Sequence, residues 1–401
     1  MGLFSFDKFL VLDGSTGYNL QKAGMPAGVC PEAWVLERPS ALMDLQRRYM
    51  AAGSDAVYAA TFGANRVKLK KYGLGDRVED INERLVNVSR NAVCSNALVA
   101  GDISPLGLFV KPFGDVTFEE MYEIYLEQAA SLEKAGVDFF VIETMLTLAE
   151  ARAALLAVKA VSDKPVAVSF TFEKNGRTIN GTDPCTALTV MQSLGADAFG
   201  INCSNGPCEV LVLIRQLTPY TRIPLLSKPN AGIPQVDTNG NARYDMSPAA
   251  FCGYTDDFVK AGVRLFGGCC GTTPEHIAAL TSSVVQCDPN GFKITSSPIL
   301  AATERKSFVP DTDDCIECDA DEMVDSGYEV GEDGVVWVRI NTPEDAETVL
   351  NDQSMLPCAL GIRADSEELA ERVIRGYNGR LLCRRDDLGD KLAGCYGIIA
   401  I

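Results

Sequence analysis

Short apolar runs alternate with longer amphipathic stretches from about residue 9 to residue 286. Most of these runs are continuously apolar, which is typical of parallel strands that other elements cover on both faces. They predict eight strands, at residues 9–13, 56–61, 98–102, 139–144, 166–171, 198–202, 224–229 and 263–267. Helical periodicity between the runs predicts helices that include residues 40–52, 118–135, 184–194 and 248–261.

One short pattern recurs where a predicted helix leads into the next strand. A small or apolar residue is followed by glycine at residues 52–55, 135–138, 194–197 and 261–264. Glycine just past a helix end can adopt the left-handed conformation that closes the helix. Eight strands in roughly 280 residues, with helices between them, indicate a (β/α)8 TIM barrel. An open doubly wound sheet is the alternative, but its glycine fingerprint is missing.

The alternation stops near residue 286, where the composition changes. Residues 311–334 contain eleven acidic residues and neither Lys nor Arg, so residues 287–334 are interpreted as a solvated acidic linker. Apolar segments at 335–340 and 396–401, with a helix around 366–376, predict a small α/β piece at residues 335–401. The expected organisation is a barrel at residues 1–286, the linker, and this C-terminal appendage.

Composition and charge narrow the range of partners. The formal net charge of −18 disfavours nucleic acid as a partner, although a protein with a basic face remains compatible with it. No apolar run reaches the length of about 18 residues that a membrane span needs, and the N-terminus does not resemble a signal peptide. We therefore expect a cytoplasmic protein without a membrane partner.

The sequence contains fourteen cysteines and a single histidine, His276. In a long chain with no export signal, reduced thiols are the expected state, and a site with several imidazole ligands is excluded. Cys203 directly follows the sixth predicted strand, while Cys269 and Cys270 follow the eighth. Barrel enzymes carry their functional groups at the C-terminal ends of the strands, so these three thiols can converge. Three thiolates leave one tetrahedral position open, which is the pattern of a catalytic zinc site.

Other readings of these residues remain open at this stage. A buried cysteine is usually inert, which we assume for Cys94, Cys185 and Cys252. Instead of binding zinc as two thiolates, the adjacent residues Cys269 and Cys270 could form a vicinal disulfide. Two further thiols, in a C-x-x-C pattern, have no second pair at zinc-finger spacing; they are Cys315 and Cys318. The single histidine follows Thr-Thr-Pro-Glu, a helix-capping pattern, so we interpret it as a first-turn helix residue rather than a metal ligand.

Several motifs, in this order along residues 7–286, resemble those of the homocysteine S-methyltransferase family. They are Asp-Gly (13–14), Thr-Phe-Gly-Ala-Asn (61–65), Gly-Asp-Ile (101–103), Ile-Glu-Thr (142–144), Asn-Gly-Thr-Asp-Pro (180–184), Gly-Ile-Asn-Cys-Ser (200–204), Lys-Pro-Asn-Ala-Gly (228–232) and Gly-Gly-Cys-Cys-Gly-Thr-Thr-Pro-Glu-His (267–276). The sequence is most similar to the homocysteine-binding barrel of the cobalamin-dependent methionine synthases in that family.

The resemblance implies a (β/α)8 barrel in which Cys203, Cys269 and Cys270 bind Zn²⁺ and the metal binds the sulfur of homocysteine. It also implies that Asp13 and Glu143 hold the substrate ammonium group. The loops that approach the amino-acid moiety would contain Gly14 and Thr61. A purely structural reading of Asp13, as a turn former before the glycine, remains the alternative.

The implied reaction is methyl transfer to the homocysteine thiol, giving methionine. Methylcobalamin on a separate corrinoid protein is the first expectation for the methyl donor, because the resemblance is to the cobalamin-dependent branch. A direct donor such as S-methylmethionine or betaine is the alternative. A non-catalytic subunit that binds zinc or thiols is a third hypothesis.

The C-terminal part departs from the pattern of the family. Residues 356–363 and 369–380 faintly resemble part of the pterin-binding barrel that follows in these methionine synthases. About 115 residues are too few for a complete second barrel, so we expect no folate site there. We expect this part to support docking or stability, without a second active site.

Overall fold

The computed structural model describes residues 2–236, 242–296, 298–384 and 390–401. Its N-terminal part is a barrel of eight parallel strands in the order β1-β10-β7-β6-β5-β4-β3-β2. The strands are β1 Leu10–Val11, β2 Ala56–Tyr58, β3 Leu98–Ile103, β4 Phe139–Met145, β5 Val166–Phe170, β6 Ala198–Cys203, β7 Leu225–Pro229 and β10 Val263–Phe266. Each predicted strand is present, and the (β/α)8 architecture is confirmed.

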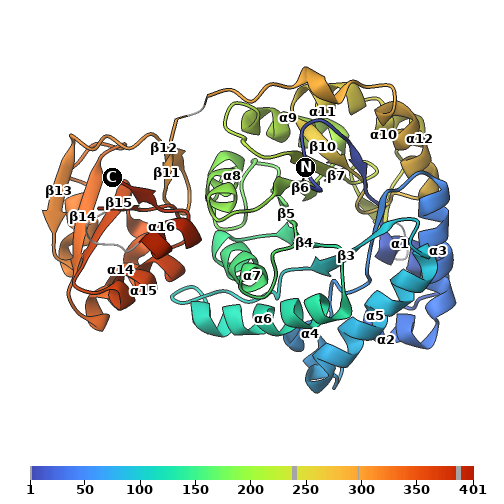
Figure 1. Cartoon of the computed structure of the whole chain (residues 1–401), viewed down its shortest axis with the longest axis horizontal. Helices are drawn as coiled ribbons and strands as arrows, with labels where there is room; N and C mark the ends of the chain where they lie inside the picture. Colours follow the sequence, from blue (N-terminus) through green and yellow to red (C-terminus); the bar gives the residue numbers. More distant parts are fainter. Residues whose placement is uncertain (1, 237–241, 297, 385–389) are drawn as a thin grey trace.

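Helices surround the strands on the outside of the barrel (Figure 1). They are α1 Thr16–Lys22, α2 Pro31–Glu37, α3 Pro39–Ala51, α4 Arg66–Lys70, α5 Val78–Val93, α6 Phe118–Ala135, α7 Leu148–Val161, α8 Pro184–Ser193, α9 Pro207–Leu217, α10 Pro248–Cys252, α11 Thr255–Lys260 and α12 Pro274–Val284. Short 3-10 turns lie at Gly75–Arg77 and Pro289–Gly291. Among the residues that the structure describes, no helix is both long and apolar enough to cross a membrane.

Local sequence explains where these helices begin and end. The capping box of Thr117 and Glu120 starts α6, and Gly136 ends it at φ 79°. The glycines of the other recurring patterns also have positive φ: Gly53, Gly195 and Gly262. The single helix predicted at residues 248–261 is wrong, because the chain forms α10 and α11 there. The two helices are separated at Gly253, and glycine has a low helix propensity. The prediction followed the apolar periodicity across this residue and gave the glycine too little weight.

The seam between β1 and β2 closes the barrel without a regular ladder. One backbone bond crosses it, from Asp55 N–H to the Val11 carbonyl at 2.7 Å. Two carboxylates complete the seam: Asp55 accepts from Val11 N–H at 2.8 Å, and Asp13 Oδ2 accepts from Tyr58 N–H at 2.9 Å. Side chains thus replace missing strand pairing at this point, and one of them is a predicted site residue.

A second unit, residues 300–401, is called the C-terminal domain below. Its five-stranded sheet is parallel and in sequence order, from β13 to β17. The elements are β11 Ala301–Ala302, β12 Ser307–Phe308, β13 Cys315–Cys318, α13 Met323–Gly327, β14 Val335–Ile340, α14 Pro343–Asp352, β15 Ala359–Ala364, α15 Glu367–Gly376, β16 Leu382–Cys383, α16 Asp390–Cys395 and β17 Ile399–Ala400. Short 3-10 turns occupy Ala320–Glu322 and Gln353–Met355.

The acidic stretch at residues 311–334 does not form the solvated linker or loop that we expected. It contains β13 and α13, and β13 pairs in parallel with β14. Ile316, Cys318 and Met323 pack into the apolar cluster between the sheet and its helices. The acidic side chains occupy the positions between these residues, so the segment is an edge of the sheet with a charged outer surface.

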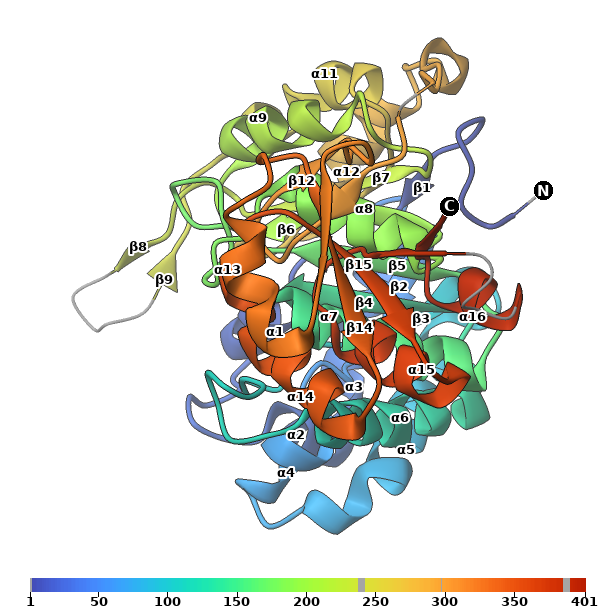
Figure 2. The ribbon, with the colours of Figure 1, turned by 90° about the vertical axis from the view of Figure 1, so that its left-hand side faces the viewer.

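The C-terminal domain is fastened to the side of the barrel next to α7 and α8 (Figure 1). The guanidinium of Arg152, on α7, is buried and donates to the carbonyls of Ile374 at 2.7 Å and of Arg375 and Gly379 at 3.3 Å. The side chain of Arg375 forms a two-pronged ion pair with Glu119 of α6, at 2.9 Å for each contact. In Figure 2 the C-terminal domain faces the viewer, and the pair β8 Gln235–Val236 and β9 Ala242–Arg243 projects from the barrel.

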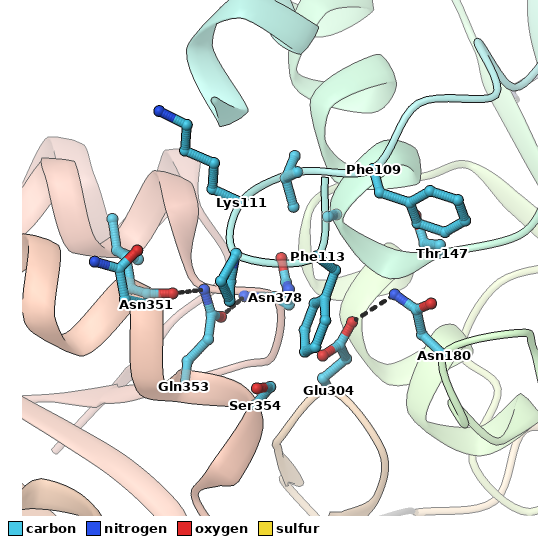
Figure 3. Close-up of a pocket in the computed structure, with 14 residues that line it drawn as sticks. Phe109, Lys111, Phe113, Thr147, Asn180, Glu304, Asn351, Gln353, Ser354 and Asn378 are labelled. Carbon is cyan, nitrogen blue, oxygen red and sulfur yellow. Dashed lines mark hydrogen bonds between the residues drawn. The ribbon is translucent and has the colours of Figure 1, made fainter. Parts of the chain in front are cut away.

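A small polar pocket lies in the junction between the two units (Figure 3). The buried carboxylate of Glu304 accepts a hydrogen bond from Asn180 at 3.2 Å, and Phe113 lies beside it. Burial raises the pKa of Glu304. The pocket offers about 10 Å³ of space, roughly what one water molecule needs. It therefore joins the two units rather than forming a site for a substrate.

Candidate metal and substrate site

Three cysteine sulfurs converge at the C-terminal end of the barrel. Cys203 is the last residue of β6, while Cys269 and Cys270 lie in the loop after β10. The Sγ atoms of Cys203 and Cys270 are 3.9 Å apart, and all three sulfurs lie within 4.8 Å of one another. Ligands at the usual Zn–S distance in a tetrahedral site are about 3.8 Å apart. The spacing of these sulfurs therefore fits a zinc ion.

The loop that carries the two adjacent cysteines depends on glycine. Gly271 has φ 81°, and a Cβ there would lie 2.2 Å from the ring of Tyr244. Backbone hydrogen bonds fix this loop to the one after β7: Cys269 N–H donates to the Pro229 carbonyl at 2.8 Å, and Ala231 N–H donates to the Cys270 carbonyl at 2.9 Å. The positions of both thiols are set by the backbone before any ligand binds.

Three residues near the C-terminal ends of β4 and β6 have a strained backbone. Thr144, Cys203 and Ser204 have φ values of 62°, 57° and 53°, in the left-handed region that favours glycine. The side chain of Asn202 holds Thr144 in place, since its Oδ1 accepts from Thr144 N–H at 2.8 Å and its Nδ2 donates to the threonine hydroxyl at 2.7 Å. Ser204 is held from β5, with its hydroxyl accepting from Phe172 N–H at 2.8 Å. Such strain persists where the surroundings over-determine the backbone, as they do at functional sites.

Hydrogen bonding among the three sulfurs distributes their protons unequally. Contacts with Cys203 and then Cys269 lower the pKa of Cys270 well below the ordinary thiol value. Contacts with Cys269 and Cys270 raise the pKa of Cys203. One sulfur of the cluster therefore gives up its proton readily and accepts hydrogen bonds from the others.

Next to the cysteines, the barrel interior contains a cluster of charged side chains. Asp13 follows β1, Glu143 lies on β4 and Lys228 lies on β7, and all three are buried. The Lys228 Nζ is 3.6 Å from Asp13 Oδ1 and 3.6 Å from Glu143 Oε2. It also lies 3.4 Å from the centre of the Tyr58 ring. A third buried carboxyl, that of Asp102, completes the cluster.

Burial governs the charges of this cluster. It raises the pKa of Asp13 to about 6, against the opposing effect of Lys228. The pKa of Glu143 is raised by burial as well, and that of Asp102 is raised well above its ordinary value by burial and by Glu143. Burial disfavours the charge of Lys228, but the acidic groups around it raise its pKa more strongly. The amine therefore stays protonated, while the carboxyls compete for one internal counter-ion.

Two other predicted site residues lie in the same region. A Cβ at Gly14 would come within 2.7 Å of the Tyr49 hydroxyl and 2.8 Å of Thr272 Oγ1, so close packing requires glycine there. Thr61 is buried, and its hydroxyl donates to the Asp102 carbonyl at 2.9 Å and accepts from Asp102 N–H at 3.0 Å. Thr61 thus connects the ends of β2 and β3 beside the charged cluster.

The remaining candidates lie elsewhere. The Nε2 of His276 donates to the Met246 carbonyl at 2.9 Å, and its Nδ1 accepts from Thr273 N–H at 3.3 Å, which is a capping arrangement. Cys315 is exposed on β13 whereas Cys318 is buried in the core below it, so these two thiols do not face a common site. All fourteen cysteines are free thiols, including the adjacent pair.

Three residues of the site were not predicted from the sequence: Lys228, Asn202 and Tyr244. A signal for the lysine was present, because it is the only charged residue in the predicted strand at residues 224–229. The same reasoning applies to Glu143, at the end of an otherwise apolar strand. No local pattern marks the asparagine or the tyrosine, whose contacts come from other strands and loops.

Comparisons with known proteins agree on the family. The family described as homocysteine S-methyltransferase matches residues 10–284. The methionine synthases of Mycobacterium leprae and Mycobacterium tuberculosis are each 32% identical to this chain, over 302 and 316 residues, or 70% and 74% of it. The chain spans about a quarter of these relatives, 25% and 26% of their lengths. The crystal structure of the metallated homocysteine methyltransferase MmuM from Escherichia coli has a similar fold, with a TM-score of 0.59, 24% identity, and coverage of 69% of this chain and 96% of that one.

Proposed function

The chain belongs to the homocysteine S-methyltransferase family, and from this premise we propose that it transfers a methyl group to the thiol of homocysteine, giving methionine. The observation that carries the proposal is the convergence of the Cys203, Cys269 and Cys270 sulfurs at the C-terminal end of the barrel. Their mutual spacing suits zinc, and three protein ligands leave one tetrahedral position for a substrate.

Zinc, when bound, stabilises the thiolate form of a substrate thiol, and the thiolate is the nucleophile in methyl transfer. The protein keeps the three ligand sulfurs in place through the strained ends of β4 and β6 and the two backbone bonds between the loops after β7 and β10. Because no side chain has to remove the substrate proton, we assign no general base.

We assign recognition of the substrate ammonium group to Asp13 and Glu143. Asp13 Oδ1 and Glu143 Oε2 are buried and have no hydrogen-bond partner among the described residues. Folding has already removed both oxygens from water. An ammonium group that reached them would give each a hydrogen bond without a further cost of desolvating them. Gly14 and Thr61 delimit the same region, where tight packing of the glycine leaves no room for a side chain.

For the methyl donor we propose methylcobalamin carried by a separate corrinoid protein. The similarity to methionine synthases supports this choice, as does the rim of the barrel mouth. Exposed apolar side chains lie in the loops after β2, β5 and β7, namely Phe62, Ile179 and Ile233. Exposed apolar groups around a site favour contact with another macromolecule.

The function is tested by incubating the zinc-loaded protein with homocysteine and, separately, each donor: a methyl-corrinoid protein, free methylcobalamin, S-methylmethionine and betaine. We expect methionine with the corrinoid donors. Methionine formed only from S-methylmethionine or betaine would contradict the donor assignment. Homocysteine binding without turnover for every donor would favour a non-catalytic subunit.

Zinc content tests the ligand set independently of activity. Serine substitutions at Cys203, Cys269 and Cys270, one at a time, should each lower the zinc-to-protein ratio and the activity. Cys315→Ser is the matched control, because this thiol is exposed on the C-terminal domain. A variant with full zinc occupancy would remove that residue from the site.

A further inference from the structure

The buried cation of the charged cluster has no role in the assignments above. Lys228 is 3% exposed, and its contacts are the two ion pairs with Asp13 and Glu143 and the face of the Tyr58 ring. An ammonium group has three N–H donors, and a hydrogen bond from such a donor to oxygen is usually 2.7–3.2 Å long. At 3.6 Å from both carboxylates, Lys228 neutralises them, but both contacts are longer than an ordinary hydrogen bond.

Lys228 is therefore a donor that binds its neighbours only at long distance, and it lies beside two acceptors without close partners. Asp13 Oδ1 and Glu143 Oε2 have no hydrogen-bond partner within the described part of the chain. Burying unused donors and acceptors costs free energy, and native proteins retain such groups mainly where a ligand completes them. A lysine that served only as a counter-ion for the carboxylates would gain most by moving within hydrogen-bond distance of one of them.

The arrangement of charges matches a zwitterion. Two carboxylates and one ammonium group lie next to each other in the barrel interior, with 3.6 Å from the ammonium nitrogen to each carboxylate. An α-amino acid carries its ammonium and its carboxylate on one carbon atom, so its two charges are also close neighbours. Placed head to tail, the two sets form favourable pairs at both ends: ammonium with carboxylates, and carboxylate with lysine.

We infer that Lys228 is a specificity-determining residue that donates to the carboxylate of the thiol substrate, while Asp13 and Glu143 bind its ammonium. The inference rests on the proposed function and deepens it, because it adds a residue that recognises the substrate carboxylate. Thiols that lack the carboxylate lose the lysine contact, and thiols that lack the ammonium leave the two carboxylates with one cation between them.

Three thiols with the same chain length separate these contributions: homocysteine, 3-sulfanylpropan-1-amine, which lacks the carboxylate, and 4-sulfanylbutanoate, which lacks the ammonium. Dissociation constants are measured by calorimetry with the zinc-loaded full chain, under reducing conditions. In Lys228→Met we expect homocysteine and 4-sulfanylbutanoate to bind at least about tenfold more weakly, the scale of one charged hydrogen bond. Binding of 3-sulfanylpropan-1-amine should change by less than about twofold, because it makes no contact with the lysine.

Lys260→Met is the matched control, since Lys260 is exposed on α11 and pairs with the surface carboxylate of Asp256. If Lys228→Met does not fold, Lys228→Gln and the wild-type comparison of the three thiols test the same point. Equal weakening of all three thiols, or tighter binding of the amine alone, would overturn the inference and make Lys228 a counter-ion that competes with the substrate ammonium. Wild-type protein that binds 3-sulfanylpropan-1-amine as tightly as homocysteine would overturn it too. Wild-type zinc protein that binds none of the three thiols would instead overturn the proposed function itself.

Discussion

The barrel and the C-terminal domain both use parallel strands, but the mouth of the barrel buries charged side chains, whereas the sheet of the C-terminal domain buries apolar ones. At the mouth of the barrel, Asp13, Glu143 and Lys228 lie in the interior. In the C-terminal domain, the face of the sheet that turns away from its helices is covered by apolar groups, including Val335 and Trp337. Burying charges costs far more free energy than burying apolar groups, so the two regions are built for different purposes.

Polar atoms without partners follow the same division. In the barrel, buried side-chain atoms that lack a hydrogen bond occur near the mouth, as at Asp13 and Glu143, and on the surrounding helices, as at Asn82 and Thr186. Within the described part of the C-terminal domain, the one such atom is Asn378 Oδ1, at the junction with the barrel. The charges of this domain instead form exposed ion pairs, such as Arg339 with Glu317. Polar groups that are free to bind a ligand therefore lie in the barrel, whereas the polar groups of the C-terminal domain mostly bind one another.

The comparison is tested most strongly at the contact between the two regions. Replacing Arg152 with Met removes the donor to three carbonyls at the end of α15, and those oxygens remain buried. We expect the free energy of unfolding to fall by about 3 kcal/mol, with zinc content unchanged in the folded protein. Denaturant titration with a zinc assay measures both. The control Arg339→Met removes two exposed ion pairs, with Glu317 and Asp319, and should cost no more than about 1 kcal/mol. A loss of zinc from folded Arg152→Met protein would show that the junction between the two units also supports the metal site.

A smaller effect is expected at the barrel mouth, on substrate binding rather than on the free energy of unfolding. Glu143→Gln removes one negative charge that faces the proposed ammonium position, while the residue keeps its shape. Homocysteine binding should weaken by roughly 1.5–3 kcal/mol, the range for a hydrogen bond to a charged group, and zinc should be retained. Calorimetric titration provides the measurement. Unchanged homocysteine affinity would show that Glu143 does not bind the ammonium group and that its role is structural.

The smallest effect is expected at His276, which lies in the barrel but serves structure. Its ring caps α12 and donates to the Met246 carbonyl, so His276→Gln should leave kcat at saturating substrate nearly unchanged. A steady-state assay with the active donor tests this. General acid–base residues contribute on the order of a hundredfold to ten-thousandfold in rate. A loss of that size with intact folding would show that the only histidine takes part in the reaction.

The barrel could be predicted because its strands are covered on both faces and read as continuous apolar runs. The prediction failed where two signals competed. In the acidic stretch, the charge count outweighed the alternation of Ile316 and Cys318 with polar neighbours, and this alternation is what forms β13. At residues 248–261, apolar periodicity continued across Gly253 although the helix did not.

The site could be predicted only in part, for a related reason. The cysteines follow predicted strands directly, so topology alone brings them to one end of the barrel. The position of Lys228 depends on partners on β1, β2 and β4, which are distant in sequence. Its burial therefore emerges only when the barrel closes. The strain at Thr144 is likewise set by the side chain of Asn202, which no local pattern reveals.

The carboxylate of Asp13 belongs at once to the β1–β2 seam and to the charged cluster. Its Oδ2 accepts from the Tyr58 amide, while its Oδ1 faces Lys228. The hydrogen of this amide exchanges with solvent only when the seam opens locally. A ligand that binds Oδ1 also restricts the motion of Oδ2, which accepts the hydrogen bond from the Tyr58 amide. Binding of substrate at the barrel mouth is therefore expected to slow hydrogen exchange of this amide on β2.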